Sequence, residues 1–204
     1  KLDNYKLYNK AISKTNSKIN FNISKNIGAH SLFNFSKNLH KVKRHQEGYE
    51  VIKKTKVEVI KLSSFLKYKK FHRIKYLHCD AQGSDLDVLK SLEKNLKYLN
   101  FGIVEVSAEK KRNLYIKSHN NLLDLKRFLK KKNFIINKID TNDIYGNELN
   151  VNFKNISMID REFLNFFDKF KLRFYQKFIR KIIMNHHKVF LYQLFFRILN
   201  AKYY

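Results

Sequence analysis

The sequence contains no proline, no tryptophan and a single cysteine, Cys79. One cysteine excludes an internal disulfide and fits a reducing compartment. Apolar residues nowhere form an uninterrupted run of the roughly 20 residues that a membrane-spanning helix needs, and no signal-peptide pattern is visible. We therefore expect a cytoplasmic protein, or one that associates with a membrane only peripherally.

Acidic residues are also scarce, because 17 Asp and Glu stand against 43 Lys and Arg, for a formal net charge of +26. Such a charge favours polyanionic partners. The chain is also rich in Lys, Asn, Ile, Phe and Tyr, a composition that AT-rich coding produces without any selection for binding. No nucleic-acid recognition motif is visible, so nucleic acid is not the expected partner. A non-enzymatic polyanion-binding module, on RNA or on an acidic membrane surface, remains the second hypothesis for the function.

The apolar pattern predicts an α/β fold. Short apolar or alternating segments indicate strands, and segments with helical spacing lie between several of them. Strands that alternate with helices favour a mainly parallel sheet, and the last two strands should form a final antiparallel pair. The predicted strands are 5–12, 19–23, 57–62, 74–79, 101–107, 134–139 and 149–153, the predicted helices are 85–98 and 122–133, and an irregular loop covers 25–48.

A change of composition divides the chain into a sheet domain, 1–158, and a basic, aromatic-rich tail, 159–204, for which we expect helices. Between 161 and 204, ten Lys and Arg stand against two acidic residues, which predicts docking on an acidic membrane surface. The competing interpretation is that the aromatic stripe packs on the sheet domain or on a partner chain. The stripe consists of Phe163, Phe167, Phe170, Phe174 and Phe178.

The stretch from Tyr76 to Leu89 predicts a buried strand, a tight turn and a helix. Gly83 permits the turn, because glycine takes φ > 0 at no steric cost. Asp80 stands at the carboxyl end of the strand, where ligands bind in open α/β sheets. Asp80 is therefore a candidate site residue, and a turn-fixing carboxylate is its structural alternative.

Three further side chains are candidates for the same site. His78 shares a strand face with Asp80 and could act as a general base, with a hydrogen-bonded structural histidine as the alternative. Gln82 could orient a substrate hydroxyl or only fix the turn. Glu105 lies on a strand expected to be buried, where an unpaired carboxylate costs several kcal/mol, so it serves the site or has a structural partner. Cys79 alternates away from these residues and is expected in the core.

The loop over 25–48 carries two candidate substrate contacts, His30 and Ser31. The only adjacent histidines, His186 and His187, point in different directions on a predicted helix and are poor metal ligands. No metal site is predicted.

Four short motifs follow one another along the chain. They are Asn-Lys-Ala-Ile-Ser at 9–13, Gly-Ala-His-Ser-Leu at 28–32, His-Cys-Asp-Ala-Gln-Gly-Ser-Asp-Leu-Asp-Val-Leu at 78–89, and Ile-Val-Glu-Val at 103–106. In this order they resemble the FkbM-type S-adenosylmethionine-dependent methyltransferases. That family shows Ala-Val/Ile-Ser, Gly-x-x-Ser-Leu, Lys/His-Ile-Asp-Val-Glu/Gln-Gly-x-Glu-x-x-Val-Leu and Ile-x-x-Glu-Val. Ser63 departs from the family, which usually has Asp there. The resemblance covers residues 5–155.

The resemblance implies a partial Rossmann-like class I methyltransferase sheet. It also implies methyl transfer from S-adenosylmethionine to a hydroxyl of a sugar, a glycan or another small metabolite. Asp80 or His78 would accept the proton, and Gln82 and Glu105 would position the acceptor or the amino-acid end of the cofactor. The residues expected near the cofactor are Asn9, Ala11 and Ser13, on the adenine side, and Asp80.

Class I methyltransferases hold the cofactor on a glycine-rich loop after their first strand. The five glycines of this chain are too far apart to form such a loop: Gly28, Gly48, Gly83, Gly102 and Gly146. We therefore expect a fragment that lacks the main cofactor-binding half, is inactive by itself, and receives the loop from a longer parent protein. A degenerate domain without activity is the alternative.

Overall fold

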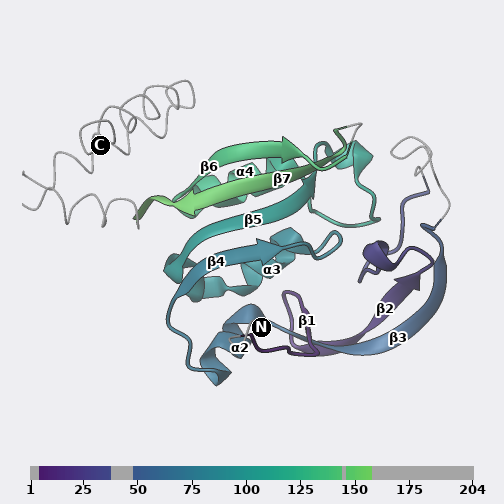
Figure 1. Cartoon of the computed structure of the whole chain (residues 1–204), viewed down its shortest axis with the longest axis horizontal. Coiled ribbons are helices and arrows are strands. Elements are labelled where there is room, and N and C mark those ends of the chain that lie inside the picture. The colour runs from purple at the N-terminus through teal and green to yellow at the C-terminus, as the bar shows by residue number, and fades with distance from the viewer. Residues whose placement is uncertain (1–4, 38–47, 144–145, 158–204) are drawn as a thin grey trace, which may run out of the picture. The chain divides into compact units, whose positions relative to one another are not determined.

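The computed structural model describes residues 5–37, 48–143 and 146–157 (Figure 1). The described residues up to Asn155 belong to one compact unit of mixed α/β structure with two small sheets. The predicted tail, 159–204, lies outside the described residues, as does the central part of the predicted loop. Within the described ranges, no helix is both long and apolar enough to span a membrane.

The larger sheet has four strands in the order β4-β5-β7-β6. The strands are β4 (Ile74–Cys79), β5 (Leu99–Ser107), β6 (Phe134–Thr141) and β7 (Glu148–Asn155). The pair β4 and β5 is parallel, whereas β7 runs antiparallel to both β5 and β6. The predicted final antiparallel pair is therefore confirmed.

The smaller sheet has three strands in the order β1-β3-β2. They are β1 (Ala11–Ile12), β2 (Ser17–Ser24) and β3 (Val51–Ile60); β1 and β3 are parallel, and β2 and β3 are antiparallel. The expectation of one mainly parallel sheet is wrong, because the strands divide between two sheets and antiparallel pairs dominate. The link 13–16 is far too short for the crossover that parallel neighbours need, so the chain has to reverse after β1.

Three predicted boundaries are also wrong. The strand predicted over 5–12 is limited to Ala11–Ile12, because only these two residues pair with β3. Leu7, in the part that is not a strand, is 90% exposed. The strand β3 begins at Val51, and its early lysines hid the strand pattern. The predicted helix 85–98 divides into α3 (Asp85–Ser91) and a 3-10 turn (Glu93–Tyr98), because Glu93 has a left-handed φ of 51° that no α-helix tolerates.

Helices cover one face of the larger sheet. Figure 1 shows α3 and α4 (Leu122–Lys131) on the same side of it. Leu89 of α3 and Leu125 of α4 are fully buried in the same hydrophobic core as residues of β5 and β7. Cys79 belongs to this core, as predicted, and burial raises the pKa of its thiol. The short helix α2 (Leu62–Tyr68) follows β3. This packing fixes the carboxyl end of β4, from which the site is built.

Candidate functional site

The chain makes a tight turn directly after β4, over residues 80–84. Gln82 and Gly83 have φ values of 44° and 89°, so two successive residues are left-handed. The N–H of Ser84 donates to the carbonyl of Ala81 at 3.1 Å and closes the turn before α3 begins. The turn exposes the Asp80 carboxylate, whereas Cys79 before it stays in the core.

Side chains from distant parts of the chain hold this turn in place. The Ser31 hydroxyl donates to the Gln82 carbonyl at 2.7 Å, and the Ser118 hydroxyl donates to the Gly83 carbonyl at 2.7 Å. A Cβ on Gly83 would lie only 2.5 Å from the ring of Tyr115. Glycine is therefore required here by both the backbone conformation and the neighbouring ring.

A buried carboxylate lies beneath the turn. Asp85, at the start of α3, is 0% exposed. Its oxygens accept hydrogen bonds from the N–H of Ala81 at 3.4 Å, the N–H of Glu105 at 3.2 Å and the Asn120 amide at 3.2 Å. Burial raises the pKa of Asp85 to about 7, although the backbone hydrogen bonds act in the opposite direction. Asp85 thus joins the turn, β5 and the loop before α4.

Asp80 is oriented by a chain of two hydrogen bonds. The Gln82 amide donates through Nε2 to Oδ1 of Asp80 at 2.6 Å, and the Tyr115 hydroxyl donates to Oε1 of Gln82 at 2.6 Å. Tyr115 is buried, and burial, followed by the charges of Glu148 and Glu105, raises the pKa of its phenol. The phenol is therefore protonated at neutral pH and acts as a donor.

A cavity of about 580 Å³ opens between the turn and the smaller sheet. Asp80, Ala81, Gln82 and Ser84 line it from the turn. The remaining lining residues come from the smaller sheet and the segments beside it: Asn9, Lys10, Ala11, Ile12, Phe21, His30, Leu32, Lys56, Val57 and Glu58. The wall of the cavity is thus partly apolar, and it carries carboxylates as well as hydrogen-bond donors.

His30 supplies one of these donors. Its Nδ1 accepts a hydrogen bond from the backbone N–H of Ser24 at 3.2 Å. A ring nitrogen that accepts a hydrogen bond carries no proton, so in this arrangement the proton of the neutral ring is on Nε2. His30 also lines the cavity, and in this tautomer the Ser24 hydrogen bond leaves its Nε2–H unused.

The cavity brings together some of the sequence-predicted site residues but not all of them. The predicted residues that line it are Asn9, Ala11, His30, Asp80 and Gln82.

Four predicted site residues are not among the lining residues. His78 is exposed on β4 opposite Ile103, and the carboxylate of Glu105 accepts a hydrogen bond from the Asn142 amide instead. Ser13 is buried, and its N–H donates to the carbonyl of Ile60 in β3. Ser31 is buried and holds the turn, so the structure gives it a supporting position. The cavity therefore contains Asp80 without His78 or Glu105.

Sequence reasoning missed three residues that support the site: Asp85, Tyr115 and Asn120. Asp85 had a usable signal, because it stands where the family pattern has Glu. Tyr115 and Asn120 lie in an irregular loop without periodicity, and only the fold brings them to the turn. Among the described residues, no group of three or more His, Cys, Asp or Glu could hold a metal ion.

A family model described as the methyltransferase FkbM domain matches residues 2–136 of this chain, well over half of its 204 residues. The chain belongs to the FkbM methyltransferase family. Neither the curated proteins nor the solved structures that were compared with the chain give a match. The FkbM match contains every residue that lines the cavity, as well as Asp85, Tyr115 and Asn120.

Proposed function

We propose that this FkbM-family chain functions in an S-adenosylmethionine-dependent O-methyltransferase. In that enzyme Asp80 accepts the proton of the acceptor hydroxyl. The observation that carries the proposal is the position of Asp80. It is an exposed carboxylate that lines the cavity. Its orientation is fixed by the hydrogen bond from Gln82, which in turn accepts one from Tyr115. The family match supports methyl transfer as the reaction class.

We also propose that the four-stranded sheet is part of a Rossmann-like class I methyltransferase sheet. Its support is the antiparallel insertion of β7 between β5 and β6, together with the cavity beyond the carboxyl end of β4.

The lining residues fit S-adenosylmethionine in part. The cavity, of about 580 Å³, has the size of an ordinary small-molecule site. Its apolar wall, which includes Ala11 and Phe21, suits a flat heterocycle, and the Asn9 amide adds hydrogen-bonding capacity. The Asp80 carboxylate suits a cationic centre. We therefore assign Asn9 and Ala11 to the adenine side and Asp80 to the reacting end.

When bound, S-adenosylmethionine supplies an electrophilic methyl group. The protein has to align an acceptor hydroxyl and remove its proton, and alignment alone can lower the barrier by several kcal/mol. Asp80 accepts that proton as general base. His30 donates its Nε2–H to a neighbouring oxygen of the acceptor and orients it. A sugar, a glycan or another small polyhydroxylated metabolite meets both requirements.

The test compares Asp80→Asn with His78→Asn in the protein expressed from its complete reading frame. Methyl transfer from tritiated S-adenosylmethionine to a panel of methyl hexosides is measured, and cofactor binding is measured by calorimetry. Asp80→Asn should lower turnover about 10²- to 10⁴-fold, the usual contribution of a general base. His78→Asn is the matched control and should keep the parental rate, because His78 does not line the cavity.

Thermal unfolding of both variants should match the parent, because Asn at position 80 can still accept the Gln82 hydrogen bond. Two results would refute the proposal. Absence of cofactor binding would remove the assigned reaction. Loss of turnover in His78→Asn with normal turnover in Asp80→Asn would transfer the proton acceptor to His78.

A further inference from the structure

The Asp80 carboxylate is exposed, and only one of its oxygens is held. Gln82 Nε2 donates to Oδ1 at 2.6 Å, whereas no hydrogen bond from the described residues reaches Oδ2. An exposed carboxylate normally rotates among several positions. The Gln82 hydrogen bond therefore restricts the rotation and leaves the second oxygen for an acceptor hydroxyl.

Gln82 can hold Asp80 only if its amide faces the right way. An amide presents an N–H donor on one side and a carbonyl acceptor on the other. Tyr115 selects between the two, because its hydroxyl donates to Oε1 at 2.6 Å and so turns Nε2 towards Asp80. The reversed amide would place its carbonyl oxygen against the Asp80 carboxylate, and two acceptors repel each other.

Tyr115 is itself fixed in position. Its side chain is buried, its ring lies against the backbone of Gly83, and its N–H donates to the Asn113 amide oxygen at 3.0 Å. The ring also contacts Phe35 with a centroid distance of 5.6 Å. A rigid phenol of this kind holds the amide without a large loss of entropy when a ligand binds.

We propose that Tyr115 is a positioning residue, which acts through Gln82 to hold the Asp80 carboxylate towards the cavity. The proposal rests on the proposed function, because it assumes that Asp80 is the proton acceptor. Tyr115 is not among the residues that line the cavity. Its effect reaches the reaction only through the side chain of Gln82.

A double-mutant cycle tests this pathway in the protein expressed from its complete reading frame. Tyr115→Phe keeps the ring and removes the hydroxyl, and Gln82→Ala removes the amide. Each change should lower kcat by about 10- to 100-fold with little change in KM, as expected for a misplaced catalytic group. The double variant should be no slower than Gln82→Ala, because Tyr115 has nothing left to orient. Losses that multiply would overturn the proposal, since they indicate two independent roles.

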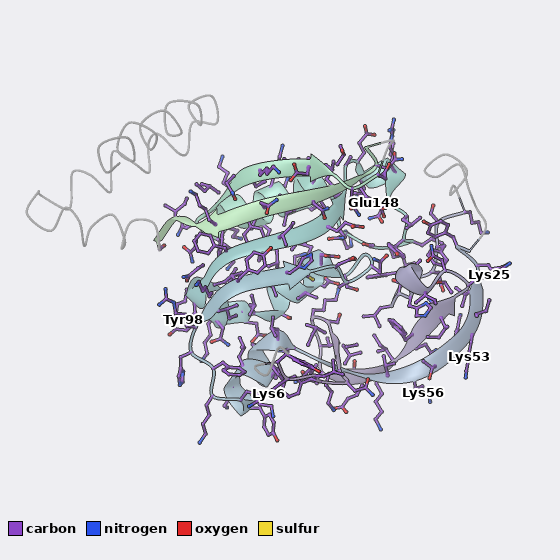
Figure 2. All side chains as sticks on the ribbon, viewed as in Figure 1. Lys6, Lys25, Lys53, Lys56, Tyr98 and Glu148 are labelled. Atoms are coloured by element: carbon purple, nitrogen blue, oxygen red, sulfur yellow. The ribbon has the colours of Figure 1, made fainter. Side chains whose placement is uncertain are left out.

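Tyr98→Phe is the matched control. It also removes one phenol hydroxyl, but Tyr98 precedes β5 and so lies at the opposite end of the parallel β4–β5 pair from the turn (Figure 2). Tyr98→Phe should leave kcat unchanged. A comparable loss of kcat in this control would show that the effect of Tyr115→Phe is not specific to the turn, and would overturn the proposal.

A second measurement separates this proposal from the proposed function. The side-chain amide signals of Gln82 in ¹H–¹⁵N spectra report its hydrogen bonds without any reaction. They should shift in Tyr115→Phe and in Asp80→Asn and stay unchanged in Tyr98→Phe. If the Gln82 signals shift in both variants while both variants keep normal turnover, the positioning by Tyr115 is correct and Asp80 is not the base. If Tyr115→Phe leaves the Gln82 signals unchanged, the positioning proposal itself is wrong.

Discussion

The backbone N–H of Glu105, in β5, donates a hydrogen bond of 3.2 Å to Oδ1 of Asp85, at the start of α3. The Asp85 side chain is fully buried, and its other oxygen accepts from the Asn120 amide at 3.2 Å. One carboxylate therefore connects a strand, a helix and a loop directly beneath the turn that carries Asp80. The protonation state of Asp85 is consequently coupled to the stability of the site.

The first prediction concerns the pH dependence of folding. Burial raises the pKa of Asp85 from 3.8 to about 7, so the folded protein binds this proton more tightly than the unfolded chain does. The contribution of Asp85 to stability is then fully present below pH 4 and decreases as the pH rises towards 7, by about 4 kcal/mol in all. Asp85→Asn removes this dependence. Urea unfolding at pH 5 and pH 8 should show the variant gaining stability relative to the parent at the higher pH.

Ser91→Ala is the control for that experiment. Ser91 is also a buried polar residue of α3, and its hydroxyl donates to the Val88 carbonyl at 2.6 Å, but it does not titrate. Its effect on the free energy of unfolding should be the same at both pH values. A parallel pH response of Asp85→Asn and the parent would show that Asp85 does not cause the slope.

The second prediction concerns Gly83 and the ring of Tyr115. In Gly83→Ala the new Cβ has to adopt a φ of 89° and would lie 2.5 Å from the ring. The left-handed conformation costs about 1–2 kcal/mol, and the overpacking adds about 1–3 kcal/mol. Gly146→Ala is the matched control, because Gly146 also has a positive φ, of 64°, but its nearest contact would be Thr141 at 3.8 Å.

Urea unfolding should therefore show a larger loss of stability for Gly83→Ala than for Gly146→Ala. The difference between the two losses of stability reports how closely Tyr115 packs against the turn. Equal losses would mean that the ring moves away freely, and the packing of Tyr115 against the turn would then be too loose to position Gln82.

The third prediction concerns residues 161–204, which lie outside the described residues, so it rests on the sequence. Their ten Lys and Arg predict binding to anionic vesicles, with each basic residue near the surface contributing about 1 kcal/mol. Co-sedimentation with phosphatidylserine-containing vesicles should show binding that weakens with salt and disappears when residues 161–204 are deleted. Absence of binding at low salt, together with destabilisation by the truncation, would instead support packing of the tail on the protein.

Sequence periodicity identified the elements that are most strongly patterned. The strand that ends at Cys79, the helix that begins at Leu122 and the closing antiparallel pair are where the apolar spacing predicts them. The motif around Asp80 and Gly83 also indicated both the turn and the family. These features depend on local order along the chain, on backbone freedom at glycine and on alternation of apolar residues, and all of them can be read from one sequence.

The pairing of the strands and the set of residues at the site were decided only by the tertiary structure. Nothing local indicates that β2 pairs antiparallel with β3, since periodicity does not reveal which strand lies beside another. His78 and Asp80 share a strand face in sequence, yet Asp80 lines the cavity and His78 does not, because the turn redirects the chain immediately after β4. Tyr115 is 33 residues from Gln82 along the chain, and only tertiary packing, against Gly83 and Phe35, brings its hydroxyl to the site.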